Sequence, residues 1–184
     1  MNISKQEAQE SLTEIESAIA RTRRAMGLHG GHILMIWGIV WAIGFATTQF
    51  CPRDAGWVWL ALDIFGFGGT WICAVKSRAR FHRPGPNRVG LAWLVLFGYF
   101  VLWNFLLQPV NEREGIAFSV TVFMCAYVIM GLWLSRVLLW LGLAVTALTL
   151  AGFYFLPAWF PLWTAITGGG ALFFSGLYIH KSWK

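Results

Sequence analysis

The feature that most constrains this chain is a series of six long apolar runs that carry almost no charge. They lie at about residues 32–50, 57–76, 90–108, 116–134, 137–155 and 159–179. A helix needs about 20 predominantly apolar residues to cross a hydrocarbon layer roughly 30 Å thick, and each run has about that length. Because 58% of the 184 residues are hydrophobic and only 12% are charged, little of the chain is left for a water-soluble domain. We therefore predict an all-α, polytopic membrane protein, with a six-transmembrane-helix bundle over residues 32–184 and the lipid bilayer as its surroundings.

The distribution of basic residues predicts the orientation of these helices. Cytoplasmic loops of membrane proteins retain an excess of Lys and Arg. Of the 14 Lys and Arg residues, only Arg53 and Arg113 fall on one side of the predicted spans, and the others fall on the opposite side. Both termini are therefore predicted in the cytoplasm, and this charge bias favours a bacterial inner (cytoplasmic) membrane. The same distribution of Lys and Arg accounts for the net charge of +6, so the charge does not require a nucleic-acid partner, and we expect none.

A weak internal repeat is visible when the spans are taken in pairs. The first member of each pair has a glycine among large apolar residues and is followed by a proline, which is Pro52, Pro109 or Pro157. Three hairpins in the same orientation would form parallel two-helix repeats around an axis along the membrane normal. The alternative is that glycine and aromatic residues are simply common in membrane helices.

Residues 1–31 are predicted to form a cytoplasmic amphipathic helix and a linker. Ser4 and Glu7 fit a capping box, which satisfies backbone N–H groups at the start of a helix. One apolar stripe follows at near-heptad spacing, formed by Leu12, Ile15, Ile19 and Met26. We predict that this stripe is the interface with a cytoplasmic protein partner or with another copy in a homo-oligomer. The alternative is a helix that covers the cytoplasmic face of its own bundle.

Asp63 is the only ionisable side chain well inside a predicted span. A carboxylate in hydrocarbon is costly, so such a residue marks a proton or cation pathway or a hydrogen bond between helices. Thr70 shares its helical face, and the candidate polar companions on the neighbouring spans are Asn104, Gln49 and Gln108. Proton or ion coupling by Asp63, Thr70 and Asn104 is one hypothesis. A structural hydrogen bond explains the carboxylate equally well.

All four histidines map to the predicted cytoplasmic boundary, and they are His29, His32, His82 and His180. Imidazoles from several parts of the chain can bind a transition metal or haem. No carboxylate or cysteine accompanies them at ligand spacing, so we expect no metal site and no cofactor. A metal- or haem-binding membrane protein that uses these histidines is kept as an alternative.

The sequence shows no machinery for catalysis. It contains no HExxH motif and no paired carboxylates inside the spans, and the glycines at 66–69 and 168–170 precede no Lys-Ser or Lys-Thr pair. The chain is therefore predicted not to be an enzyme. The leading hypothesis is a membrane anchor or interaction protein that engages its partner through the N-terminal helix, and the alternative is a small-solute or ion transporter or channel that uses Asp63.

Overall fold

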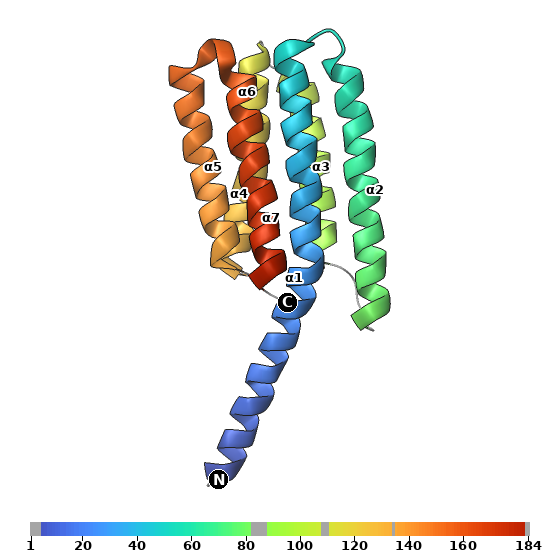
Figure 1. Ribbon diagram of the computed structural model, residues 1–184, viewed down its shortest axis with the longest axis vertical. Helices are drawn as coiled ribbons and strands as arrows, with labels where there is room; N and C mark the ends of the chain where they lie inside the picture. Colours follow the sequence, from blue (N-terminus) through green and yellow to red (C-terminus); the bar gives the residue numbers. More distant parts are fainter. Residues whose placement is uncertain (1–4, 82–87, 108–110, 134, 183–184) are drawn as a thin grey trace.

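In the computed structural model, residues 5–81, 88–107, 111–133 and 135–182 are described, and all regular structure within them is helical. The elements in chain order are α1 (Lys5–Phe50), α2 (Ala55–Phe81), α3 (Arg88–Leu107), α4 (Glu112–Trp133), α5 (Arg136–Phe155), a 3₁₀ turn η1 (Pro157–Trp159), α6 (Phe160–Thr164), a π-helical segment η2 (Ala165–Gly169) and α7 (Gly170–Ser182) (Figure 1). The last four elements form one rod that we call span six.

Six helical segments of the described chain are long and apolar enough to cross a membrane. They are Gly30–Phe50, Ala55–Lys76, Val89–Leu106, Glu112–Trp133, Arg136–Phe155 and Pro157–Ser182. The prediction of an all-helical fold with six such helices is confirmed. The fourth helix begins earlier than its apolar run because the side chain of Asn111 accepts a hydrogen bond of 3.0 Å from the backbone N–H of Glu114 and so caps the helix.

Helix α1 is one continuous helix of 46 residues. The sequence predicts a linker before residue 32, but Gly30 and Gly31 are helical and join the N-terminal segment directly to the first apolar span. The N-terminal part of α1 projects beyond the end of the bundle, and no other described helix lies beside it (Figure 1). We call the end of the bundle from which α1 projects the basal end.

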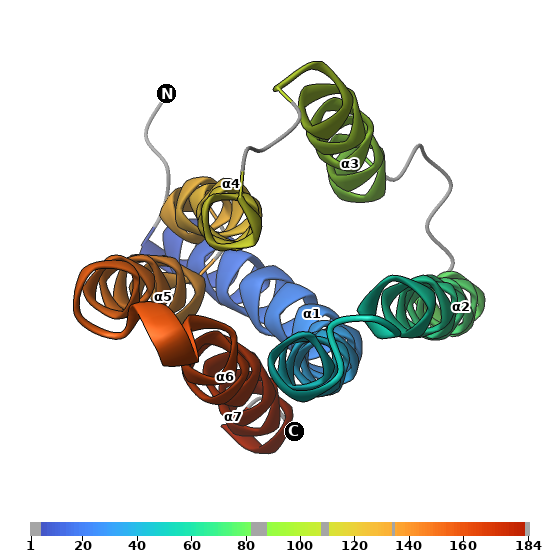
Figure 2. The same cartoon turned by 90° about the horizontal axis from the view of Figure 1, so that it is seen from above.

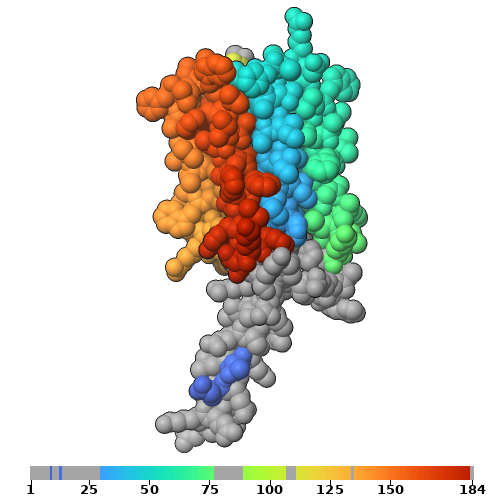
Figure 3. Space-filling model, viewed as in Figure 1, coloured from blue at the N-terminus to red at the C-terminus, as the bar shows by residue number. Residues whose placement is uncertain are grey.

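The most extensive packing in the bundle is between α1 and α7, which form one face together with α2 (Figure 3). Glycines bring the backbone of α1 close to the backbones of α7 and η2. A Cβ atom on Gly38 would lie 2.6 Å from the backbone nitrogen of Phe173, and one on Gly169 would lie 2.8 Å from that of Ala42. Small residues allow this approach, and close packing drives association of helices in lipid. The second extensive contact is between α4 and α5.

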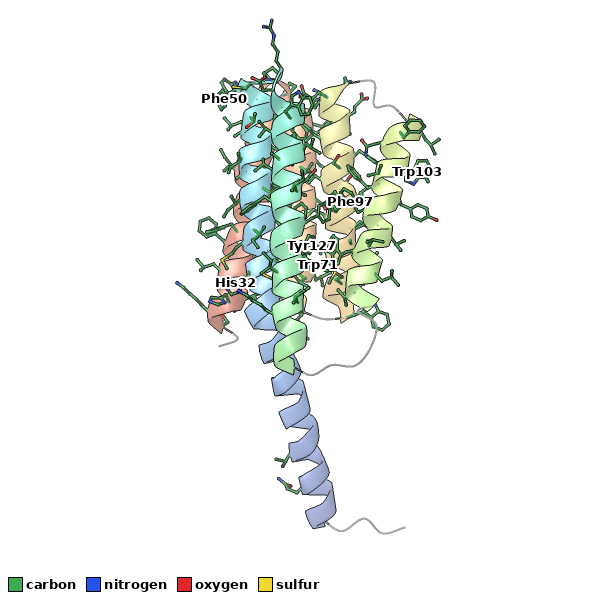
Figure 4. All side chains as sticks on the ribbon, turned by 90° about the vertical axis from the view of Figure 1, so that its right-hand side faces the viewer. His32, Phe50, Trp71, Phe97, Trp103 and Tyr127 are labelled. Atoms are coloured by element: carbon green, nitrogen blue, oxygen red, sulfur yellow. The ribbon has the colours of Figure 1, made fainter. Side chains whose placement is uncertain are left out.

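Helix α3 stands apart from the other helices when the bundle is seen along its axis (Figure 2). Its backbone makes little contact with its neighbours, so side chains join it to the bundle. Phe97 points toward α2 and α4, whereas Trp103 points outward from the bundle (Figure 4). Even the inward-facing residues Trp93, Phe97 and Phe100 are only half-buried.

Candidate functional site

Asp63 lies in the interior of α2, about 12 Å along the helix axis from Ala55 at about 1.5 Å per residue. Its side chain is half-buried. Residues four positions apart are neighbours on a helix surface, so Asp63 lies between Trp59 and Phe67. Both of these rings contact side chains of α1, Trp59 with Phe45 and Phe67 with Trp37. The carboxylate therefore stands on the aromatic side of α2, next to the face that packs on α1.

Ring contacts join α1, α2, α3 and α4 in a closed circuit, which we call the aromatic circuit. The distances between consecutive ring centroids are as follows: Trp37–Phe67 5.2 Å, Phe67–Phe97 4.9 Å, Phe97–Phe100 6.2 Å, Phe100–Phe123 5.0 Å and Phe123–Trp41 6.3 Å. Trp37 and Trp41 are both on α1, one helical turn apart, and complete the circuit. Aromatic pairs at these separations contribute beyond their area of contact. These contacts attach α3 to α2 and α4.

Thr70 is engaged by a residue that the sequence analysis did not single out. The indole nitrogen of Trp37 donates a hydrogen bond of 3.1 Å to the hydroxyl oxygen of Thr70. Gly66 leaves room for this ring, since a Cβ atom there would lie 3.2 Å from it. The close neighbour at this position on α2 is therefore the Trp37 side chain.

The other polar companions expected for Asp63 form hydrogen bonds elsewhere. The amide of Asn104 donates to the carbonyl oxygen of Phe100 in its own helix, at 2.9 Å, and the amide of Gln49 donates to the carbonyl oxygen of Ala158 in span six, at 3.2 Å. Gln108 lies outside the described residues. No hydrogen bond joins Asp63, Thr70 and Asn104 to one another within the described part of the chain. Their coupling role stays a prediction.

Two of the four histidines meet at the basal end of the bundle. The ring centroids of His32 in α1 and His180 in α7 are 4.5 Å apart, with the ring planes at 66°. His32 is exposed beside the base of the projecting helix (Figure 4). The side chain of His29 and the whole of His82 lie outside the described residues. Over the described ranges, no group of three or more His, Cys, Asp or Glu side chains is arranged to hold a metal ion.

The predicted partner interface lies on the projecting part of α1. Its backbone is helical from Lys5 onward, which is the conformation that the apolar stripe requires. The side chains of Leu12, Ile15, Ile19 and Met26 are outside the described set, whereas those of Gln9 and Thr13 in the same part of the helix are described and exposed. The interface itself stays a prediction.

Comparisons with protein-family models, with curated proteins and with solved structures found no match to this chain. The functional proposals therefore rest on the residues of this chain alone.

Proposed function

We propose that the chain is an integral protein of a bacterial inner membrane, with both termini in the cytoplasm. Six apolar helices of spanning length support insertion. Lys76 lies near the basal end of α2, Arg136 begins α5 at that end and Lys181 lies in the last turn of α7, whereas Arg53 and Arg113 lie at the opposite end. The positive-inside rule assigns the basal end to the cytoplasm. The three helix pairs, in this proposal, are repeated hairpins, a feature supported by the glycine and proline pattern of the sequence.

We further propose that the protein is a non-enzymatic anchor that presents the projecting part of α1 to a cytoplasmic protein partner or to another copy of the chain. The observation that supports this is the continuity of α1. Lys5–Phe50 is a single helix, and its part before Gly30 extends for about 37 Å at about 1.5 Å per residue. Because the same helix packs on α2 and α7, the bundle sets the direction of the projecting part.

Affinity purification in mild detergent tests this proposal. We expect a stoichiometric partner, either a second protein or a second copy, to copurify with the full chain and to be lost when residues 1–28 are removed. Ile15→Asp with Ile19→Asp should have the same effect, since it places charge on the apolar stripe. Gln9→Asp with Thr13→Asp is the matched control, because these side chains are exposed. A full chain that purifies alone, at the mass of a monomer, would contradict the proposal.

A second candidate function, proton or cation coupling, is favoured by the position of Asp63. Its carboxylate lies within a helix of spanning length and makes no hydrogen bond or ion pair with any side chain in the described ranges. An intramembrane carboxylate in this situation is a candidate ion site. We expect liposomes containing the protein to conduct protons or a cation, and Asp63→Asn to abolish that flux. Asp54→Asn, in the exposed turn before α2, is the matched control. Undiminished flux in Asp63→Asn would remove Asp63 from any pathway.

A further inference from the structure

His32 and His180 lie side by side where α1 crosses α7. Gly31 directly precedes His32, and Gly176 lies one helical turn before His180. A Cβ atom on Gly31 would lie 2.7 Å from the carbonyl oxygen of Gly176. The same hypothetical atom would lie 3.1 Å from the Cβ of His180. The backbones that carry the two imidazoles therefore cannot move apart without breaking the packing of α1 on α7. This pair is built by the fold, since its members are separated by almost the whole bundle in sequence.

The separation of the two rings suits one shared metal ion. A ligand nitrogen lies about 2.0–2.1 Å from Zn²⁺, so the centre of its imidazole ring lies about 3 Å from the metal, and two rings at the tetrahedral angle have centroids about 5 Å apart. The observed centroid separation is 4.5 Å. The planes are inclined at 66°, so the two rings are in edge contact and are not stacked face to face.

The same geometry disfavours haem between these two residues. Two imidazoles on opposite sides of one iron would have centroids about 6 Å apart, with a flat macrocycle between them. At 4.5 Å the two rings are in edge contact, and no macrocycle fits between them. A small ion that approaches from the exposed side of His32 does not need the space that a macrocycle requires.

We propose that His32 and His180 bind one divalent transition-metal ion of the Zn²⁺, Ni²⁺ or Cu²⁺ class, with water completing the coordination. Imidazole suits these metals, whereas Mg²⁺ and Ca²⁺ take oxygen ligands. The two histidines are the only protein ligands in this proposal, since no group of three or more candidate ligands is found in the described ranges. The bound ion clamps α1 to α7 at the base of the projecting helix, so metal binding stabilises the crossing that directs it.

Zinc titration of the full chain tests this site. The protein is purified in detergent without a histidine tag, and bound zinc is measured by equilibrium dialysis and by the shift in Tm. We expect one Zn²⁺ per chain and a Tm that rises with zinc concentration, because an ion that binds only the folded state stabilises it. Mg²⁺ should give no shift. Loss of an outer-shell partner alone weakens metal affinity 10–100-fold, so loss of either ligand should weaken zinc binding by about 100-fold or more.

The variants are His32→Ala and His180→Ala, with His32→Gln and His180→Gln as replacements of similar size should the alanine variants unfold. Lys181→Ala is the matched control, because it changes an exposed neighbour of His180 that does not ligate. Zinc binding that is unchanged in the double His32/His180 variant would overturn the proposal. So would a wild-type chain that binds no zinc at millimolar concentration. Binding that is lost in both single histidine variants and kept in Lys181→Ala supports it.

Discussion

Two adjacent glycines show how sharply the surroundings change within one turn of α1. A Cβ atom added to Gly30 would meet no atom within 4 Å, whereas one added to Gly31 would lie 2.7 Å from a backbone oxygen of α7. Backbone atoms of a packed helix cannot yield in the way that the end of a flexible side chain can. The two positions have the same residue type for different reasons, and only the second is required by packing.

Substitutions at these glycines should therefore have opposite effects on stability. We expect Gly31→Ala to destabilise the protein by about 1–3 kcal/mol, the usual range for overpacking. Gly30→Ala should leave stability unchanged or raise it by about 0.5–1 kcal/mol, since alanine has the higher helix propensity. Unfolding followed by circular dichroism in detergent measures both. Equal stability of the two variants would mean that α1 and α7 do not cross at Gly31.

At the scale of helices, α1 and α2 are linked by two reciprocal hydrogen bonds. Trp37 of α1 donates to Thr70 of α2, at 3.1 Å, and Trp59 of α2 donates to Thr48 of α1, at 3.0 Å. Each indole lies over a glycine of the opposite helix, Gly66 or Gly44. The same arrangement thus occurs at two levels of this helix pair. In each case an indole packs over a glycine, and a threonine accepts a hydrogen bond from the indole N–H.

Removal of each acceptor should loosen this pair by a small, measurable amount. Hydrogen bonds between helices in lipid average about 0.6 kcal/mol, with a maximum of about 1.7 kcal/mol, so we expect Thr70→Val and Thr48→Val to destabilise by that order. Double-mutant cycles with Trp37→Phe and Trp59→Phe should return a coupling energy of the same size. Thr47→Val is the control, because its hydroxyl donates to Ile43 of its own helix. A coupling energy of zero would show that the indoles are held by packing alone.

At the scale of the whole molecule, the cysteines report the proposed orientation. Cys51 is exposed in the turn between α1 and α2, at the end opposite the projecting helix, whereas Cys125 is exposed on the apolar α4. The thiolate is the reactive form of cysteine and needs water. Cys51 should therefore react with a membrane-impermeant maleimide added to intact spheroplasts, and Cys51→Ser should abolish the labelling while Cys125→Ser leaves it unchanged. Labelling of Cys51 only after cell lysis would reverse the orientation.

The sequence by itself determined the number, type and approximate limits of the six helices that are long and apolar enough to span a membrane. An apolar run of about 20 residues has few stable conformations, because a backbone in lipid must satisfy its hydrogen bonds internally. Hydropathy is a local property and so is readable without tertiary structure. The alternation of basic and neutral loops is equally local, which is why it predicts an orientation even where the loops lie outside the described residues.

Only the tertiary structure decided which faces of the helices meet. An apolar helix can pack through any of its faces, and the energy differences come from close contacts between residues distant in sequence, such as Gly38 with Phe173. For this reason the sequence named His32 and His180 among four separate histidines but did not pair them. It named Thr70 as a candidate site residue but did not identify Trp37, which donates a hydrogen bond to the Thr70 hydroxyl. It also predicted a linker within residues 1–31, where the helix is continuous from its N-terminal part into the bundle and Gly31 packs against α7.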